Sequence, residues 1–147
     1  MNYTIRKLLK NDLKTLSIIM KEAFFNEPWN ETWNEETCLK RLTIFSQMSS
    51  SFSYTFINEN NEICGAAIGY VIPFVNKTEY DLQEFFIAPQ LTKQHLGTFF
   101  MNELLKEVKK AKIDTIKFYT AGNLYRFYEH FGFKRINDEY LMELNIH

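Results

Sequence analysis

The chain has 147 residues, which is the size of one ordinary domain and is long enough to bury a sizeable core. Hydrophobic residues make up 46% and aromatic residues 16% of the chain, a composition that excludes a disordered protein. The formal net charge of -1 argues against a nucleic-acid-binding protein, because such proteins need excess basic residues to neutralise phosphates. We therefore expect one folded domain, residues 1–147, without a nucleic-acid partner.

The cysteines and the N-terminal residues indicate the cellular compartment in which the protein is expected. Cys38 and Cys64 are too few for a disulfide framework and lie in no metal-ligand spacing, so we expect reduced core thiols and no metal ion. The N-terminal residues lack the apolar segment of a secretion signal, and no run approaches the ~20 apolar residues of a membrane span. We predict a cytoplasmic protein without a membrane partner.

The first third of the chain predicts a strand and two helices. Residues 3–8 form a short strand, after which Asn11 and Asp12 offer an N-cap to a helix. The apolar side chains of this helix recur at helical spacing and belong to Leu13, Leu16, Ile19, Met20, Ala23 and Phe24. Residues 35–47 predict the second helix, with Thr32 and Glu35 as a capping box.

The middle of the chain predicts three successive strands, at residues 52–57, 63–72 and 80–87. The polar runs between them, residues 58–62 and 76–79, have turn composition, so consecutive strands should pair antiparallel. Pro73 is expected to end the second of these strands because proline has no N–H to donate.

The last third predicts a helix from Leu96 to about Lys110, a strand at residues 115–119 and a short helix at 124–131. Gly132 should follow that helix as a C-cap. A final strand is expected at residues 140–146. The predicted fold class is therefore α/β, a mixed sheet with helices on both faces.

The junction between the strand at 80–87 and the helix at Leu96 is a candidate anion site. A loop that ends a strand and starts a helix points several backbone N–H groups at one place, where the helix dipole adds positive charge. This arrangement suits a pyrophosphate.

Two motifs add to this junction. Residues 127–133 read FYEHFGF and match in full the pattern Phe/Leu-Tyr-x-x-x-Gly-Phe. The pattern Gln/Arg-x-x-Gly-x-Gly/Ala ends at Gly97, with Thr92 in place of Gln or Arg and His95 in place of the first Gly. In these motifs and in its element order, the chain resembles the GNAT superfamily of N-acetyltransferases.

The resemblance implies a GNAT-like sheet and acetyl-CoA as the cofactor. The strands at 80–87 and 115–119 would run parallel and separate at one end, and the main chain of Phe86 and Ile87 would pair with the pantetheine arm as an added strand would. The residues expected around the pyrophosphate are Thr92, Lys93, Gln94, His95, Leu96, Gly97 and Thr98. If the first glycine of the motif has positive φ, a His in its place costs roughly 1–2 kcal/mol.

Asn123 has two interpretations. It is a candidate hydrogen-bond partner of the pantetheine, but Ala121 stands where the family's asparagine is usual. An N-cap of the short helix at Leu124 explains Asn123 better.

Two residues are candidates for the chemistry. Glu84 lies on the strand before the cofactor loop, where family members often place a catalytic carboxylate, and would act through a water or orient the acceptor. Tyr128 is the candidate general acid, because the family's tyrosine stands near the coenzyme A sulfur. The alternatives are a solvent-facing strand glutamate and an aromatic packing residue.

The acceptor is expected at the segment between the first two helices, where Trp29, Trp33 and Glu27 combine aromatic faces with a carboxylate that suits a cationic amine. The alternative is that the tryptophans hold this segment on the core. The sequence therefore predicts an N-acetyltransferase that acts on a small or peptidic primary amine by direct attack in a ternary complex. A catalytically weak acyl-CoA sensor or partner-binding module, a pure interaction domain and a homodimer also stay open.

Overall fold

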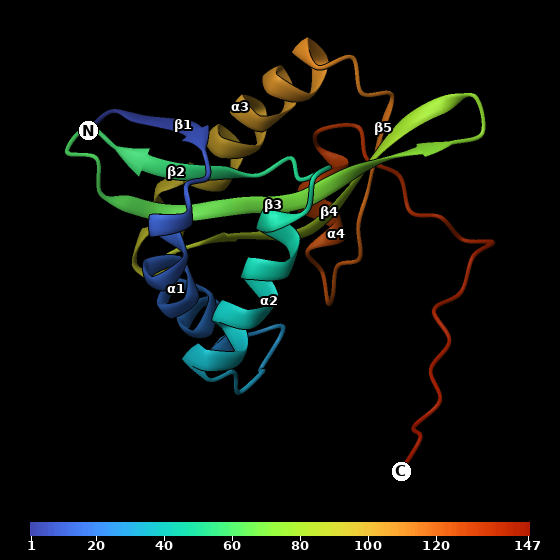
Figure 1. Ribbon diagram of the computed structural model, residues 1–147, viewed down its shortest axis with the longest axis horizontal. Coiled ribbons are helices and arrows are strands. Elements are labelled where there is room, and N and C mark those ends of the chain that lie inside the picture. The colour runs from blue at the N-terminus through green and yellow to red at the C-terminus, as the bar shows by residue number, and fades with distance from the viewer.

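The computed structural model describes residues 1–147 and contains one five-stranded sheet with the strand order β1-β2-β3-β4-β5 (Figure 1). The strands are β1 (Tyr3–Lys7), β2 (Tyr54–Asn58), β3 (Ile63–Phe74), β4 (Lys77–Ile87) and β5 (Thr115–Lys117). The helices are α1 (Leu13–Phe25), α2 (Glu35–Gln47), α3 (Leu96–Lys110) and α4 (Tyr125–Glu129). Neighbouring strands pair antiparallel except for the parallel pair of β4 and β5. The predicted mixed, mostly antiparallel sheet is confirmed.

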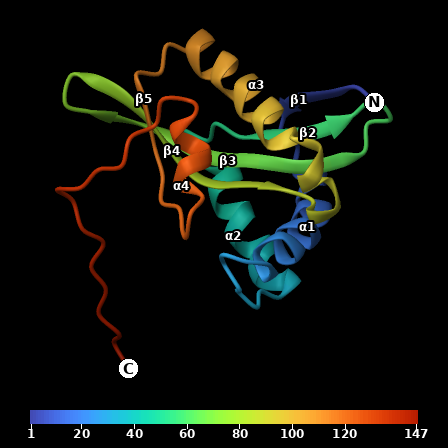
Figure 2. The ribbon, with the colours of Figure 1, turned by 180° about the vertical axis from the view of Figure 1, so that it is seen from behind.

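The helices cover both faces of this sheet, as Figures 1 and 2 show. On one face, α1 and α2 bury Leu16, Met20 and Leu42 against Ile68 and Phe86 of the sheet. On the other face, α3 forms a second core with β2 and β4 that also contacts the aromatic residues around α4. The apolar face predicted for α1 is buried or half-buried throughout, because its spacing places those side chains on one side of the helix.

The parallel pair of β4 and β5 is short. Its register joins Glu79, Tyr80 and Asp81 of β4 to the three residues of β5. Beyond Asp81, β4 continues to Ile87 without a partner from β5. The two strands thus separate toward the C-terminal end of β4, as expected.

A β-bulge in β4 decides which face Glu84 occupies. Ile68 of β3 pairs with Glu84, whereas the next residue, Gly69, pairs with Leu82, so Gln83 is an extra residue in the ladder. Leu82 contributes to the core under α3, while Glu84 faces α2 on the opposite side. Since an inserted residue reverses the alternation of side chains, the bulge places Glu84 on the α1/α2 face.

Two helix caps differ from the prediction. Asp12 precedes α1 but does not cap it, because its carboxylate accepts hydrogen bonds from Arg6, the N–H of Leu9 and Thr55. At α2 the capping residue is Asn34, whose side chain accepts from the N–H of Thr37, so the predicted Thr32–Glu35 box is wrong. At α2, Asn34 supplies the acceptor because it directly precedes the helix, whereas Thr32 lies two residues further away.

We expect Asp12→Asn to lower the free energy of unfolding by about 1–3 kcal/mol, because buried partners lose a charged acceptor. Burial acts to raise the pKa of Asp12, but hydrogen bonds from Arg6, Leu9 and Thr55 outweigh it and the pKa is lowered. The stability from Asp12 is therefore present above the ordinary pKa of 3.8 and is lost as the pH falls through the lowered value. Urea unfolding of the variant at pH 7 and below pH 4 measures both effects. The exposed Glu22→Gln in α1 is the control, and equal stabilities of the two variants would contradict this role.

Several strand boundaries also differ. β3 continues through Pro73 to Phe74, and β4 begins at Lys77, so this hairpin is longer than predicted. Proline is tolerated at position 73 because β2 pairs with β3 only as far as Ala67. At Pro73, β3 pairs with β4 on one side and has no β2 partner on the other. β5 and α4 are shorter than predicted.

The predicted final strand at residues 140–146 is wrong. Residues 134–147 contain no helix or strand, and the C-terminal segment runs away from the sheet (Figures 1 and 2). Its large apolar side chains are exposed. No strand forms because no neighbour in the chain pairs with this segment.

Cys38 and Cys64 are buried free thiols, as expected. None of the helices has the length and apolar character that crossing a membrane requires.

Candidate functional site

Glu84 is a buried carboxylate with one charged partner. Its side chain is only 8% exposed, and its Oε1 accepts a hydrogen bond from Nε of Arg41 at 2.5 Å. Arg41 lies on α2, where its guanidinium stacks over Trp33 and Phe45 at 5.8 and 5.1 Å from the ring centres. The solvent-facing alternative for Glu84 is therefore wrong.

The environment of Glu84 changes its acidity. Burial raises the pKa of Glu84 above its ordinary value, and the hydrogen bond and charge of Arg41 offset only part of this effect. A nearby carboxylate, Glu31, raises it slightly further. A carboxylate with a raised pKa is a stronger base than an exposed one.

Tyr128 lies on α4, on the side of the sheet covered by α3. Its ring packs edge-on against Phe118, Phe127 and Phe133, with ring centres 4.5, 5.0 and 6.0 Å away. Its hydroxyl makes no hydrogen bond within the protein, and burial raises the pKa of Tyr128 to about 12. The side chain is thus held by packing, while its hydroxyl stays neutral and has no internal partner.

The start of α3 carries two of the predicted cofactor residues. His95 precedes the helix in the left-handed conformation, at φ 59° and ψ 24°, so a non-glycine residue occupies a position where glycine is favoured. Glycine is favoured at position 97 for a different reason, because a Cβ atom there would lie only 3.3 Å from Cζ of Phe127. The glycine therefore lets the first turn of α3 approach α4 closely.

The other predicted cofactor residues surround this helix start. Pro89–Gln94 forms a 3-10 turn on which Thr92, Lys93 and Gln94 are exposed, and Thr92 donates its hydroxyl to the carbonyl of Pro89. Leu96 is buried, and the side chain of Thr98 is exposed. The first N–H groups of α3 have no acceptor within the helix.

The open half of β4 lies next to this turn. Phe86 and Ile87 belong to the part of β4 that β5 does not pair, and their side chains point to opposite cores. The end of β4, the turn and the start of α3 follow one another directly in the chain. Asn123 is exposed and caps no helix with its side chain, so the predicted N-cap is wrong.

The segment between α1 and α2 contacts the site from the other side. Trp29 packs edge-on against Phe24 at 5.2 Å, and Trp33 is half-buried and donates its Nε1–H to Glu31. Glu27 is exposed. This segment also reaches the loop before α4, because a Cβ atom on Gly122 would lie 2.7 Å from Cβ of Pro28.

Sequence reasoning missed Arg41. In the sequence, Arg41 looks like any other charged residue on a helix. Only its ion pair with Glu84 in the folded protein marks it as part of the candidate site. The structure thus brings Glu84, Arg41 and Trp33 together on one face, whereas Tyr128 stands with the α3 core on the other.

Comparison with known proteins gives a family. A family model described as "Acetyltransferase (GNAT) family" matches residues 14–133, a range that begins one residue inside α1 and includes every later helix and strand. No curated protein matches the chain.

Crystal structures of several other proteins have the same fold. A possible acetyltransferase of Clostridium difficile has a TM-score of 0.82 at 12% identity, and the match covers 100% of both chains. A GNAT family acetyltransferase of Staphylococcus aureus has a TM-score of 0.73 at 18% identity over 98% of this chain and 100% of that chain. Glucosamine-6-phosphate N-acetyltransferase of Arabidopsis thaliana has a TM-score of 0.68 at 15% identity over 100% of both chains. These identities are low, so the likeness concerns the fold.

Proposed function

Because this chain belongs to the GNAT acetyltransferase family, we propose that residues 1–147 form a single domain that transfers an acetyl group from acetyl-CoA to a primary amine. The reaction is direct attack of the amine in a ternary complex. The observation that carries the proposal is the separation of β4 and β5 beyond Asp81, which leaves the edge of β4 at Phe86 and Ile87 open.

The residues of this region fit coenzyme A. The open edge of β4 offers main-chain groups to the amides of a pantetheine arm, as in strand addition. The start of α3 offers unpaired N–H groups and a partial positive charge to a pyrophosphate. These contacts come from the backbone, so the departures at Thr92 and His95 leave them available.

Acetyl-CoA, when bound, supplies a thioester that an amine can attack. An amine of ordinary pKa ~10.4 is protonated at pH 7, and freeing its lone pair costs about 4–5 kcal/mol. Glu84 accepts this proton through a water, which its burial and raised pKa favour.

Tyr128 gives a proton to the departing sulfur. From ordinary pKa values, the transfer from phenol to thiolate is uphill by roughly 2 kcal/mol. Burial raises the pKa of Tyr128 to about 12. The same surroundings also disfavour a thiolate, so the difference between the pKa values of the phenol and the thiol grows by less than the full shift of Tyr128. Positioning offsets the remaining cost.

The acceptor binds at the segment between α1 and α2. Trp33 lies beside Arg41 and hence near Glu84, which supports a role in placing the amine. Trp29 packs on Phe24 and holds the segment in place, while Glu27 offers an exposed carboxylate to a cationic acceptor. A small or peptidic primary amine suits this surface.

One observation favours a second candidate, a weakly active acyl-CoA sensor. The carboxylate of Glu84 is already paired with Arg41, which lowers its availability as a base. The two candidates share cofactor binding and differ in turnover.

Thermal unfolding with acetyl-CoA, coenzyme A and a control nucleotide tests the shared part. We expect acetyl-CoA and coenzyme A to raise the Tm by mass action, and the nucleotide to have a smaller effect. His95→Ala should bind coenzyme A with a Kd within about threefold of the unchanged protein, because the backbone N–H groups remain. No shift with either cofactor would overturn the proposal. Thiol release with a panel of amines then separates the enzyme from the sensor.

A further inference from the structure

The guanidinium of Arg41 is held by two aromatic rings and one carboxylate. Its Cζ lies 5.8 Å from the ring centre of Trp33 and 5.1 Å from that of Phe45, and its Nε donates to Oε1 of Glu84. The Arg41 side chain is nevertheless 38% exposed. A side chain that is already fixed loses little conformational freedom when a ligand binds. Arg41 is therefore a preorganised cationic group that a ligand can reach.

The ion pair of Arg41 and Glu84 keeps unused donors and an unused acceptor. The bond from Nε is the only hydrogen bond of the Arg41 side chain, so the N–H groups on Nη1 and Nη2 have no partner within the protein. Oε2 of Glu84 likewise accepts no hydrogen bond within the protein. The pair thus offers a positively charged fork of donors next to a negatively charged acceptor.

A ligand that complements this pair carries both charges. A carboxylate fits the fork of a guanidinium with two parallel hydrogen bonds. A ligand with a carboxylate alone would be repelled by Glu84 and by the nearby Glu31, whose charge already raises the pKa of Glu84. An amine on the same ligand offsets this repulsion, because its positive charge attracts these carboxylates. Since Nε of Arg41 touches Glu84 directly, the amine and the carboxylate of the ligand must be only a few bonds apart.

We propose that the acceptor is a free α-amino acid, whose carboxylate binds the Nη groups of Arg41 and whose amine faces Oε2 of Glu84. This inference rests on the acetyl transfer proposed above and names the substrate class of the same site. An α-amino acid has its amine and its carboxylate on one carbon, which matches the direct contact of Arg41 and Glu84. Arg41 is then the residue that determines specificity, because it places the amine next to the group that takes its proton.

The transfer balances with the residues already described. The amine nitrogen forms a bond to the acetyl carbon while the bond from that carbon to sulfur breaks. The ammonium group loses two protons: one passes through a water to Glu84 and then to solvent, and the other replaces the proton that Tyr128 gives to the sulfur. The products are an N-acetylamino acid and coenzyme A. The acetylated nitrogen has no positive charge, so the product no longer complements Glu84 and leaves more easily.

Space for such a ligand adjoins Trp33. A cavity of about 500 Å³ is lined by Trp33, by the end of α1, and by Pro89 and Gln90 of the turn before α3. This cavity lies between the segment that contacts Arg41 and the region proposed for coenzyme A. Its volume is large enough for the side chain of an amino acid.

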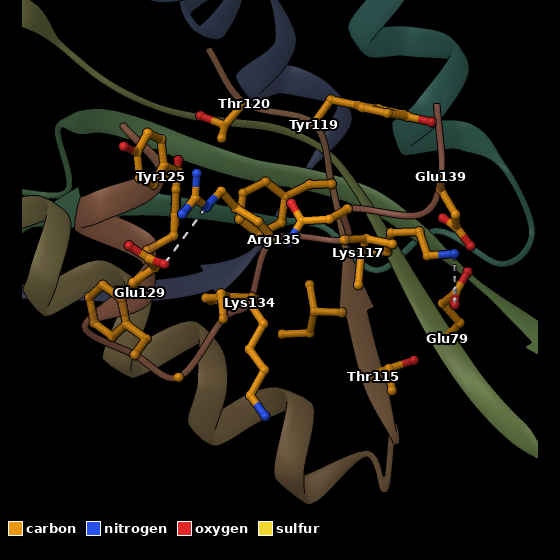
Figure 3. A pocket seen from close by; sticks show the side chains of 18 of the residues that line it. Glu79, Thr115, Lys117, Tyr119, Thr120, Tyr125, Glu129, Lys134, Arg135 and Glu139 are labelled. Carbon is orange, nitrogen blue, oxygen red and sulfur yellow. Dashed lines mark ion pairs between the residues drawn. The ribbon is translucent and has the colours of Figure 1, made fainter. Parts of the chain in front are cut away.

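A larger cavity lies at the opposite end of β4 and offers no such pair. Its volume is about 1080 Å³, and none of its lining residues comes from α2 or from the segment before α2 (Figure 3). In its walls Lys117 faces Glu79 at 3.7 Å, and Arg135 faces Glu129 at 4.0 Å. Both distances are longer than a hydrogen bond, so neither cation is fixed as Arg41 is. The place of the acceptor carboxylate is therefore assigned to Arg41.

Kinetics with matched acceptors test this assignment. Each common L-amino acid is compared with its primary amide, which keeps the amine and the side chain but lacks the negative charge. We expect Arg41→Lys to lower the ratio of kcat/KM for the preferred amino acid to kcat/KM for its amide about 10-fold or more, because lysine keeps the charge and lacks the fork. An effect of the substitution on Glu84 acts on both acceptors and cancels in this ratio. Lys40→Gln, an exposed neighbour on α2, should leave the ratio unchanged.

Calorimetry provides a readout without turnover. With coenzyme A present, we expect the preferred amino acid to bind the unchanged protein with a Kd at least about 10-fold lower than that of its amide, and Arg41→Lys to remove this difference. This comparison in the unchanged protein needs no variant to fold.

The outcomes separate this inference from the proposed function. If simple amines are acetylated but no amino acid is preferred over its amide, the inference is overturned and acetyl transfer stands. A preference for the amino acid that persists in Arg41→Lys would also overturn it, because another group would then bind the carboxylate. The absence of any Tm shift with coenzyme A would instead overturn the proposed function, and this inference with it.

Discussion

Tyr128→Phe is expected to lower kcat about 100-fold or more while leaving the Kd for coenzyme A unchanged. The hydroxyl makes no hydrogen bond within the protein, so its removal leaves no buried partner unsatisfied. The ring that packs against Phe118 and Phe127 is retained. The loss should therefore concern proton donation to the departing sulfur and not the fold.

The matched control is Tyr125→Phe, which removes a hydroxyl from the same helix. Steady-state kinetics with a titrated amine, together with the Tm of each variant, separates an effect on turnover from one on stability. If Tyr128→Phe and Tyr125→Phe turn over as fast as the unchanged protein, Tyr128 is a packing residue.

Glu84→Gln is expected to lower kcat by about 100-fold and to remove the acid limb of the pH–rate profile, because a neutral amide cannot accept the amine proton. The raised pKa of Glu84 places this limb above the pH expected for an ordinary glutamate. The rate should fall as the pH drops through that pKa, since a protonated Glu84 is no longer a base. An unaltered rate across pH would remove Glu84 from this role.

Arg41 provides a second arm of the same experiment. Its charge and hydrogen bond lower the pKa of Glu84 against the effect of burial, so Arg41→Gln should raise that pKa and move the acid limb to higher pH. The exposed neighbour Lys40→Gln should leave the limb in place. If the acid limb stays at the same pH in Arg41→Gln, a group other than Glu84 is responsible for it.

These kinetic results also decide between the enzyme and the sensor. A sensor binds coenzyme A without turnover, so none of these variants would show a change in kcat. An enzyme shows the two separate losses at Tyr128 and Glu84, one on each side of the sheet.

Much of the fold could be predicted from local pattern. The ranges of α2 and α3 and the apolar face of α1 follow from helical spacing, which depends on neighbours three and four residues away. The FYEHFGF motif and the loop before Leu96 identified the family for the same reason, since each is contiguous in the chain. The condition stated for His95 is met, because this residue has φ 59°.

The C-terminal segment shows the limit of this reasoning. Its alternation is that of a strand, and the sequence predicted one at residues 140–146. A strand forms only where it pairs with a neighbouring strand, and residues 140–146 pair with no strand of the sheet. The predicted strand is wrong because strand pairing depends on elements distant in the chain, which local alternation does not describe.

The sequence by itself determined the helices, the first five strands in chain order and the family motifs, because each rests on residues close together in the chain. Only the tertiary structure decided the setting of Glu84. The extra residue Gln83 turns Glu84 toward α2, and Arg41, 43 residues earlier, meets it there. A strand's face depends on its register with a neighbour, and an ion pair depends on two distant elements packing together, so neither could be read from local spacing.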